Sequence, residues 1–338
     1  MEERKKGRMI TNQTDSAISH GCPCCNGGQP ALTAAAIENE QIALHLHAAR
    51  AAAGNDLTVY LKLAYATHPD VKAPTIQEMM QWPPPNPGKA FDNLYFVGSR
   101  WVSAWALVTD AGIILIDAMD NDEEAERLIE GGMHKLGLNP ADIRIILVTH
   151  GHGDHYGGVN YLVGKYPARV LMSSIDWDMV ASGELEFDFP DWGRPPQRGE
   201  SIRDGDVITL GSTDVKIVLT PGHTRGTVSL QFEVHDNANT YQALLWGGTA
   251  FNFGNHTDRI GRLNQYIDST RRAKVIVRET NTRVFISNHS LFDEAVEKLE
   301  SLLHQVANPF AMTVPDVERA LTVMQECALA TLVYWSKS

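Results

Sequence analysis

A short histidine-rich loop is the feature that most constrains the fold of this chain. Three imidazoles and a carboxylate fall within six positions, at His150, His152, Asp154 and His155. They follow a mostly apolar run, residues 143–148, which predicts a buried strand. Imidazole nitrogen and carboxylate oxygen are ligands that zinc prefers. We therefore expect a metal site directly after this strand.

The loop holds more ligands than one metal ion needs. A catalytic zinc site takes three protein ligands and leaves one position for water. Four ligands this close together can face two neighbouring ions, so we expect a dinuclear centre. A polar loop that only exposes its histidines is the alternative. Gly151 and Gly153 count against it, because glycine permits the tight backbone that turns successive side chains toward one point.

The pattern His150-x-His152-x-Asp154-His155 resembles the signature of the metallo-β-lactamase superfamily, and the resemblance extends from about residue 93 to residue 303. Three further segments match the family in order: a strand ending at Asp117, residues 220–224 around His223, and residues 287–289 around His289. The resemblance implies an α/β fold, a four-layer αβ/βα sandwich with the metals at one edge of the paired sheets. Alternating strand-like and helix-like runs, including a helix over residues 122–136, agree with it.

The resemblance also assigns roles to these residues. The ligands of two zinc ions per chain would be His150, His152 and His223 for the first zinc, and Asp154, His155 and His289 for the second. Asp154 would also be the catalytic residue that orients the attacking hydroxide. Asp117 would hydrogen-bond the metal loop and fix the orientation of its ligands.

The chain departs from many members of this family at one corner of the site. Glyoxalase II-like enzymes, lactonases and phosphodiesterases carry a bridging aspartate in a Gly-Asp-Thr segment, where this chain has Gly248. Thr249 stands where the cysteine-using lactamases carry a ligand. The pattern resembles the metallo-β-lactamase subclass that lacks the cysteine ligand, and solvent would bridge the metals. We expect that an aspartate introduced at Gly248 tightens metal binding.

The resemblance implies a zinc-dependent hydrolase in which a metal-bridging hydroxide attacks the substrate. We expect a small, mostly apolar substrate with an amide-like or ester-like centre, such as a β-lactam. Hydrolysis of a lactone, an aryl ester, an organophosphate or an aryl halide is the alternative, and Gly248 makes thioester hydrolysis of the glyoxalase II type a weaker one. An iron-dependent redox enzyme is the alternative from another class. Such enzymes generally need a flavin domain or a carboxylate bridge, and the sequence shows neither.

An aromatic, acidic and proline-rich stretch over residues 183–196 has the character of an insertion. Because it is tethered at both ends, it predicts a lid or a wall of the substrate pocket; a surface loop or a dimer contact is the alternative. The expected pocket residues are aromatic: Trp177, Phe187, Phe189, Trp192, Trp246 and Phe251.

The sequence divides into four parts: a cysteine-containing arm (1–30), a helical and proline-rich extension (31–92), the catalytic domain (93–305) and a C-terminal helix (306–338). A helix is expected over residues 31–53. The last helix carries an apolar stripe at three- and four-residue spacing, which packs on its own domain or forms a homodimer contact.

Composition argues against several classes of partner. The net charge is −12 and the chain has only one short basic run, near its start, so we expect no nucleic acid. No segment reaches the roughly 20 apolar residues of a membrane helix, and no apolar signal-peptide stretch follows the first residues. We expect a cytoplasmic protein with a small-molecule substrate and no membrane partner. Cys22, Cys24 and Cys25 bind a structural metal or belong to a flexible segment.

Overall fold

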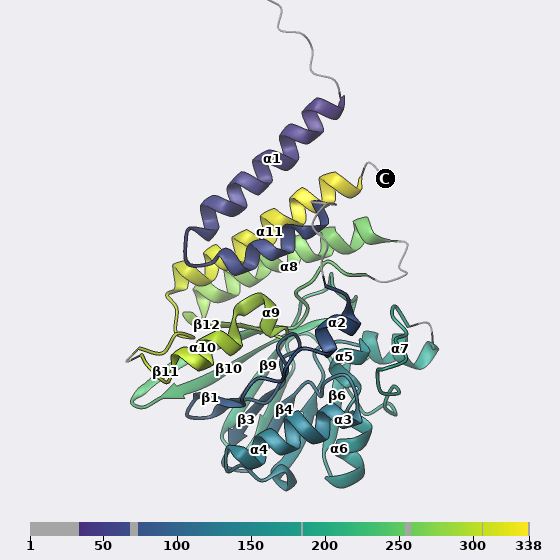
Figure 1. Ribbon diagram of the computed structural model, residues 1–338, viewed down its shortest axis with the longest axis vertical. Coiled ribbons are helices and arrows are strands. Elements are labelled where there is room, and N and C mark those ends of the chain that lie inside the picture. The colour runs from purple at the N-terminus through teal and green to yellow at the C-terminus, as the bar shows by residue number, and fades with distance from the viewer. Residues whose placement is uncertain (1–33, 68–73, 184, 254–257, 306, 337–338) are drawn as a thin grey trace, which may run out of the picture.

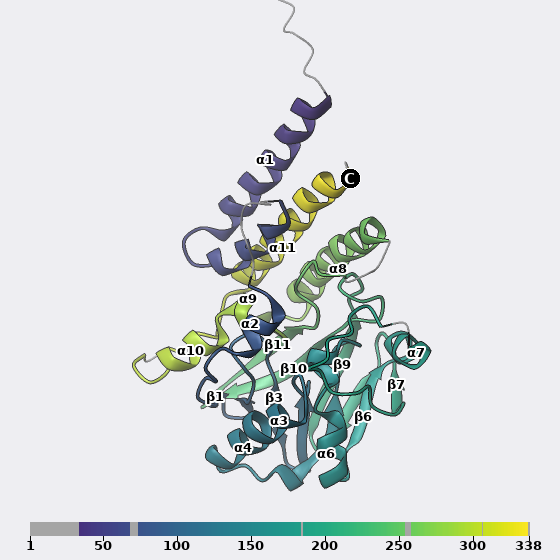
Figure 2. The same ribbon diagram turned by 45° about the vertical axis from the view of Figure 1, so that its right-hand side comes forward.

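The computed structural model describes residues 34–67, 74–183, 185–253, 258–305 and 307–336 (Figure 1). Two β-sheets pack face to face, and helices cover the outer face of each sheet (Figures 1 and 2). The four-layer αβ/βα sandwich expected from the sequence is confirmed. Cys22, Cys24 and Cys25 lie outside the described residues.

The first sheet positions the histidine-rich loop. Within the described residues its strands are, in spatial order, β1 Gly88–Phe91, β2 Leu94–Phe96, β3 Trp105–Thr109, β4 Gly112–Ile116, β5 Ile143–Leu147, β6 Arg169–Ser173 and β7 Glu200–Ile202. β1 to β4 pair antiparallel, whereas β4 to β7 pair parallel. Parallel strands end at the same edge of a sheet, so the residues after β4 and β5 lie side by side there.

The second sheet brings the later ligands to the same edge. Its strands in the described chain are, in spatial order, β12 Thr282–Ser287, β11 Asn239–Trp246, β10 Val228–Asp236, β9 Thr213–Leu219 and β8 Val207–Leu210. β11 and β12 are parallel, so Trp246 and Ser287 end next to each other. A tight hairpin connects β10 and β11. Asp236 pairs with Asn239, and Asn237 takes a left-handed conformation at φ 54°, which asparagine tolerates.

Three apolar layers hold the sandwich together. Side chains of both sheets, including Ile116, Leu147, Leu230 and Ile286, meet in the central layer. A second layer lies between the first sheet and the helices on its outer face: α3 Asp122–Glu124, η2 Ala125–Glu130, α4 Gly131–Lys135, η3 Pro140–Asp142, α5 Gly153–Tyr156, α6 Val159–Lys165 and α7 Ser174–Ser182. The helix expected over residues 122–136 is present as α3, η2 and α4, with a π-helical segment in the middle.

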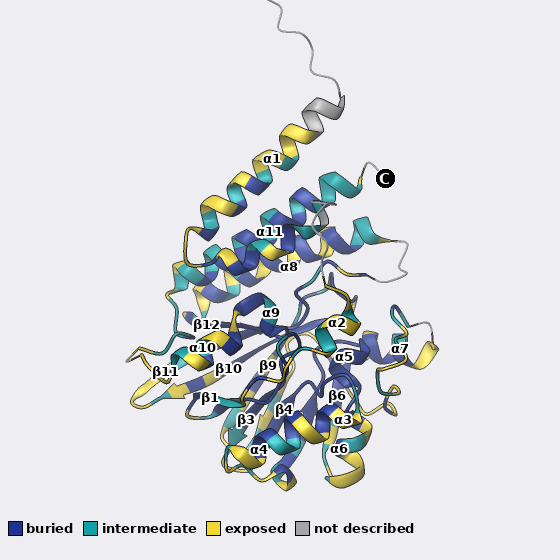
Figure 3. Cartoon of the chain, viewed as in Figure 1, coloured by how far each residue is buried: buried dark blue, intermediate teal, exposed yellow. Residues whose placement is uncertain are grey.

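The third layer unites both ends of the chain on the second sheet. Its helices are α1 Ala34–Ala53, η1 Thr58–Thr67, α8 Arg259–Glu279, α9 Ser290–Asp293 and α11 Val314–Trp335. The short helix α2 Ile76–Met80 packs against the layer on the first sheet, and α10 Ala295–Ser301 contributes to the central layer. α11 packs against both α1 and α8 and buries Leu321 and Met324 completely (Figure 3). The apolar stripe is thus covered within the chain, and the homodimer stays a prediction. No helix in the described ranges is apolar enough over its length to cross a bilayer.

Candidate metal centre

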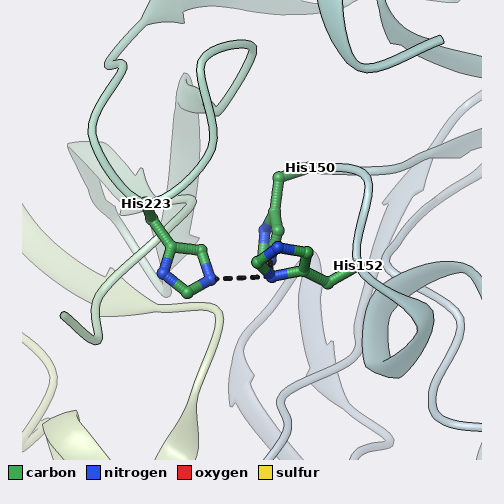
Figure 4. A group of neighbouring side chains, drawn as sticks. All are labelled: His150, His152 and His223. Atoms are coloured by element: carbon green, nitrogen blue, oxygen red, sulfur yellow. Dashed lines mark hydrogen bonds between the residues drawn. The ribbon is translucent and has the colours of Figure 1, made fainter. Parts of the chain in front are cut away.

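The side chains expected to hold the first metal converge at the common edge of the two sheets (Figure 4). His150 and His152 come from the loop after β5, and His223 comes from the loop between β9 and β10. His152 Nδ1 lies 3.1 Å from His150 Nε2 and 3.1 Å from His223 Nε2. Ligands about 2.0–2.1 Å from a tetrahedral zinc stand roughly 3.3 Å apart. The three nitrogens therefore have the spacing of ligands around one ion.

The second set lies directly beside the first. His155 Nε2 is 3.2 Å from His289 Nε2, and Asp154 Oδ2 is 3.4 Å and 3.7 Å from these two nitrogens. His150 also lies within 4.8 Å of Asp154 and His155, so the two sets adjoin. All six side chains are buried. In the described part of the chain, the Oδ1 atom of Asp154 has no hydrogen-bond partner, which leaves a ligand atom free at this point.

Hydrogen bonds fix which ring nitrogen faces the centre. Nδ1 donates to a carbonyl oxygen in three histidines, from His150 to Gly247 (2.9 Å), from His223 to Ala250 (2.7 Å) and from His289 to Trp101 (2.8 Å). His155 Nδ1 donates to Asp117 Oδ2 at 2.8 Å. Each of these bonds turns Nε2 inward, and a neutral imidazole held in this way carries no proton on Nε2. His152 is reversed, because its Nδ1 faces the centre.

Asp117 lies where the resemblance implies. It follows β4 and has a positive φ of 62°, a conformation that costs a residue with a side chain about 1–3 kcal/mol. Its Oδ1 accepts the Thr149 amide at 2.7 Å, and its Oδ2 accepts the Thr149 hydroxyl at 2.9 Å. The same carboxylate holds His155, so one residue orients both the start of the loop and a metal ligand.

Sequence reasoning missed Asp176, which joins the two ligand loops. This buried aspartate lies in the first turn of α7, and its Oδ2 accepts the Gly151 amide at 2.8 Å and the Thr224 hydroxyl at 2.6 Å. Its Oδ1 accepts the Gly226 amide at 3.0 Å. The local signal was only Ser173 three positions earlier, which is typical of a helix start and does not indicate a site.

Burial and neighbouring charges shift the pKa values of the ligands in different directions. Burial holds the pKa values of His150 and His223 well below the ordinary range and lowers the pKa of His289 to about 4. For His155, burial acts in the same direction, but the Asp154 and Asp117 carboxylates outweigh it and raise the pKa to about 10. Burial raises the pKa of Asp154, yet the neighbouring imidazoles lower it overall. Three ligands are thus neutral and ready to bind a cation.

A cavity of about 600 Å³ opens above the two ligand sets. Its floor contains His152, Asp154, His223 and His289. Apolar side chains from residues 101–292 line it: Trp101, Phe187, Trp192, Phe251, Leu291 and Phe292. Residues from the N-terminal part of the chain line it as well: Lys62, Tyr65, Pro74, Ile76 and Met79. Nothing in the sequence pattern indicated that the extension reaches the site.

The six expected pocket aromatics fall into two groups. Phe187, Trp192 and Phe251 line the cavity, and Phe189 packs against the rings of Phe187 and Trp192. The expectation for Trp177 and Trp246 is wrong, because both are buried in the apolar core. Their ring nitrogens donate to the Glu200 and Gly248 carbonyl oxygens. Residue type alone does not tell which face of an element an aromatic side chain occupies.

The aromatic stretch is a fixed wall. The Gly193 amide donates to the Asp120 carbonyl at 2.8 Å, and the Asn121 and Asn160 side chains each donate at 2.9 Å to a carbonyl of the stretch. The Trp192 ring packs directly on Gly153 of the metal loop, where a β-carbon would fall 2.4 Å from a ring atom. These contacts attach the stretch to the metal loop and its neighbours.

These side chains come from segments far apart in the sequence and form a candidate metal site beside an apolar pocket. Residues 99–237 match the model of the Metallo-beta-lactamase superfamily. For this part of the chain, the match confirms the resemblance seen in the sequence.

Solved structures with the same fold include two metallo-β-lactamases. BJP-1 of Bradyrhizobium japonicum, a subclass B3 enzyme, is 25% identical with a TM-score of 0.62, over 72% of this chain and 92% of that one. FEZ-1 of Legionella gormanii is 25% identical with a TM-score of 0.65, over 76% of this chain and 98% of that one.

Curated relatives carry a different name. Hydroxyacylglutathione hydrolase of Synechocystis sp. is 30% identical over 141 residues, which are 39% of this chain and 49% of the relative. The protein of that name from Francisella tularensis subsp. novicida is 30% identical over 141 residues, 42% of this chain and 44% of the relative. The chain thus matches about half the length of these relatives.

Proposed function

We propose that this protein is a zinc-dependent hydrolase of a small, mostly apolar substrate whose scissile group is an amide or an ester of the β-lactam type. The observation that carries this proposal is the convergence of six imidazole and carboxylate side chains, four of which line an apolar cavity. Two zinc ions, when bound, supply a hydroxide nucleophile at neutral pH and polarise the substrate oxygen.

The residues around the site supply positioning and exclude water. Asp154 reaches the cavity floor with one carboxylate oxygen unpartnered among the described residues, so it can hold a metal and orient the nucleophile. Trp101 and Phe187 flank the ligands: the Trp101 ring lies 5.6 Å from the His289 ring, and the Phe187 ring lies 4.9 Å from the His152 ring. An apolar substrate body would pack between these rings and displace water from the scissile group.

Thioester hydrolysis is a second candidate, favoured by the name of the curated relatives. Against it, Gly248 replaces the bridging carboxylate that glyoxalase II-like enzymes carry, and the cavity is mostly apolar. Lactones, aryl esters, organophosphates and aryl halides stay alternatives that fit an apolar pocket.

The test combines metal analysis with a substrate panel. The purified protein is expected to contain about two zinc ions per chain and to lose activity when a chelator removes them. The panel covers β-lactams, lactones, aryl esters, thioesters, organophosphates and aryl halides. Iron with oxygen consumption would support a redox enzyme instead, and a preference for glutathione thioesters would establish the second candidate.

A further inference from the structure

His152 differs from the other four histidines of the site because its outer nitrogen is Nε2 instead of Nδ1. Its Nε2 lies 2.9 Å from Glu186 Oε2, so the imidazole donates to a carboxylate from the aromatic stretch. Both side chains are buried, at 4% and 7% exposure. The sequence analysis did not single out Glu186, which is 34 positions away from His152 along the chain.

Arg262 of α8 completes the contact from the opposite side. Its guanidinium donates to Glu186 Oε1 at 2.6 Å and to the Gly222 carbonyl at 2.7 Å. A further N–H of the same group donates to the His223 carbonyl. Arg262 is only 1% exposed, and a buried arginine of this kind needs a fixed carboxylate partner. One side chain therefore holds both the Glu186 carboxylate and the two backbone carbonyls that flank the His223 ligand position.

An ion pair that serves the fold alone does not explain this geometry. Glu186 Oε1 satisfies Arg262, whereas Oε2 lies nearer to His152 (2.9 Å) than to Arg262 Nη2 (3.3 Å). The second oxygen is thus directed at the metal ligand. Carboxylates that accept the outer N–H of a metal-binding histidine fix its tautomer and ring orientation.

We propose that Glu186 is a positioning residue for metal binding. It accepts the His152 Nε2–H and thereby turns Nδ1 toward the first metal, and Arg262 holds the carboxylate in place. This inference rests on the proposed function, since it requires that His150, His152 and His223 bind a metal. Phe187 follows Glu186 in the sequence and lines the cavity. The contact between Glu186 and His152 therefore positions both a side chain of the pocket and a metal ligand.

The experiment measures zinc affinity by chelator competition for the full chain and for Glu186→Gln. The variant is expected to lose affinity for one of two zinc ions by about 10–100-fold while the other is retained. Asp188→Asn is the matched control, since Asp188 is an exposed carboxylate of the same stretch and its loss is expected to leave both affinities unchanged.

A spectroscopic readout separates positioning from stability. In 1H–15N spectra of the zinc-loaded protein, His152, assigned with His152→Gln, is expected to carry its proton on Nε2. Metal-free Glu186→Gln is expected to lose the preference of the His152 proton for Nε2. If Glu186 served only the fold, the substitution would lower the melting temperature and leave the His152 tautomer unchanged. If Glu186→Gln does not fold, Glu186→Asp keeps the charge opposite Arg262 and is expected to bind zinc with intermediate affinity.

The outcomes distinguish this inference from the proposed function. If the unmodified protein binds no zinc, the proposed function fails. If it binds two zinc ions and the folded Glu186 variants bind both as tightly, with His152 still protonated on Nε2, the positioning role is overturned.

Discussion

Asp154 is the one carboxylate among the six side chains of the candidate metal centre, and it lines the cavity. It lies within 4 Å of both His155 and His289, and its second oxygen is buried at the cavity floor. Such a carboxylate can bind a metal with one oxygen and orient a nucleophile with the other. A change that keeps its shape but removes its charge is therefore a direct test of its role.

We expect Asp154→Asn to lower turnover by at least about 100-fold. The asparagine amide binds zinc less well than the carboxylate does, and it cannot accept a proton from the attacking solvent molecule. The fold is expected to persist, since His150, His152 and His223 are untouched. Turnover is measured together with metal content and circular dichroism, with Asp188→Asn as the control. Near-normal turnover in a folded variant would contradict the role.

The structure reverses the expectation for Gly248. A β-carbon at this position would fall 2.6 Å from the His223 β-carbon and 2.9 Å from a Thr227 methyl, so an aspartate cannot enter without moving a metal ligand. We expect Gly248→Asp to weaken zinc binding, measured by chelator competition. Gly248→Ala, which adds the β-carbon alone, is expected to weaken it as well. Tighter binding in the aspartate variant would show that the corner accepts a carboxylate.

Among the elements, the aromatic stretch couples pocket and metal loop. Trp192 lines the cavity and packs on Gly153, so its removal takes away substrate contact area near the metals. We expect Trp192→Ala to raise the Michaelis constant by roughly 10-fold, a loss of about 1.4 kcal/mol of binding, with a smaller effect on turnover. If kinetics stay normal while light scattering reports a changed oligomeric state, the stretch is an interface element instead.

The C-terminal helix α11 belongs to the core of its own chain. Leu321 is completely buried between α11 and its neighbours. We expect Leu321→Ala to lower the free energy of unfolding by about 2–5 kcal/mol, measured by denaturant titration. Leu44→Ala in α1 is the control, because Leu44 is 61% exposed and its truncation should change stability little. A change of oligomeric state with unchanged stability in Leu321→Ala would favour the homodimer contact.

At the scale of the whole molecule, buried histidines tie stability to pH. Burial holds the pKa values of His150, His223 and His289 below the value of about 6.5 in an unfolded chain. As pH falls below about 6.5, these histidines take up protons in the unfolded chain but not yet in the folded protein. The metal-free protein therefore loses stability in this pH range. For His289 this loss continues down to pH about 4.

His155 acts in the opposite direction, because its pKa is raised to about 10. Its contribution is fully present below pH about 6.5 and is lost as pH rises through about 10. We expect the melting temperature of the metal-free protein to fall on both sides of neutral pH, with zinc removing the alkaline loss because it displaces the His155 proton. An unchanged melting temperature between pH 6.5 and 4 would contradict the neutral buried imidazoles.

The local spacing of the ligands was sufficient to predict a candidate metal centre, and the family resemblance that it carries implied the sandwich. His150, His152, Asp154 and His155 stand close together after an apolar strand, and that local spacing admits few other interpretations. The loop glycines leave room for distant side chains, because a β-carbon would fall 2.6 Å from Met179 at Gly151 and 2.4 Å from the Trp192 ring at Gly153. The strand over residues 143–148 and the helix over residues 122–136 followed from the hydrophobic pattern, whereas helix α8 Arg259–Glu279 was not predicted.

Only the tertiary structure decided what surrounds the metals. Glu186 meets His152 across 34 positions and Arg262 across 76, and each is an ordinary charged residue in its local sequence. The N-terminal extension reaches the cavity, and Trp177 and Trp246 turn into the core, because packing of whole layers chooses the face that each side chain occupies. The local sequence shows whether apolar residues repeat with the period of a helix or of a strand. Which face of the element is buried depends on packing against residues that are distant in the sequence.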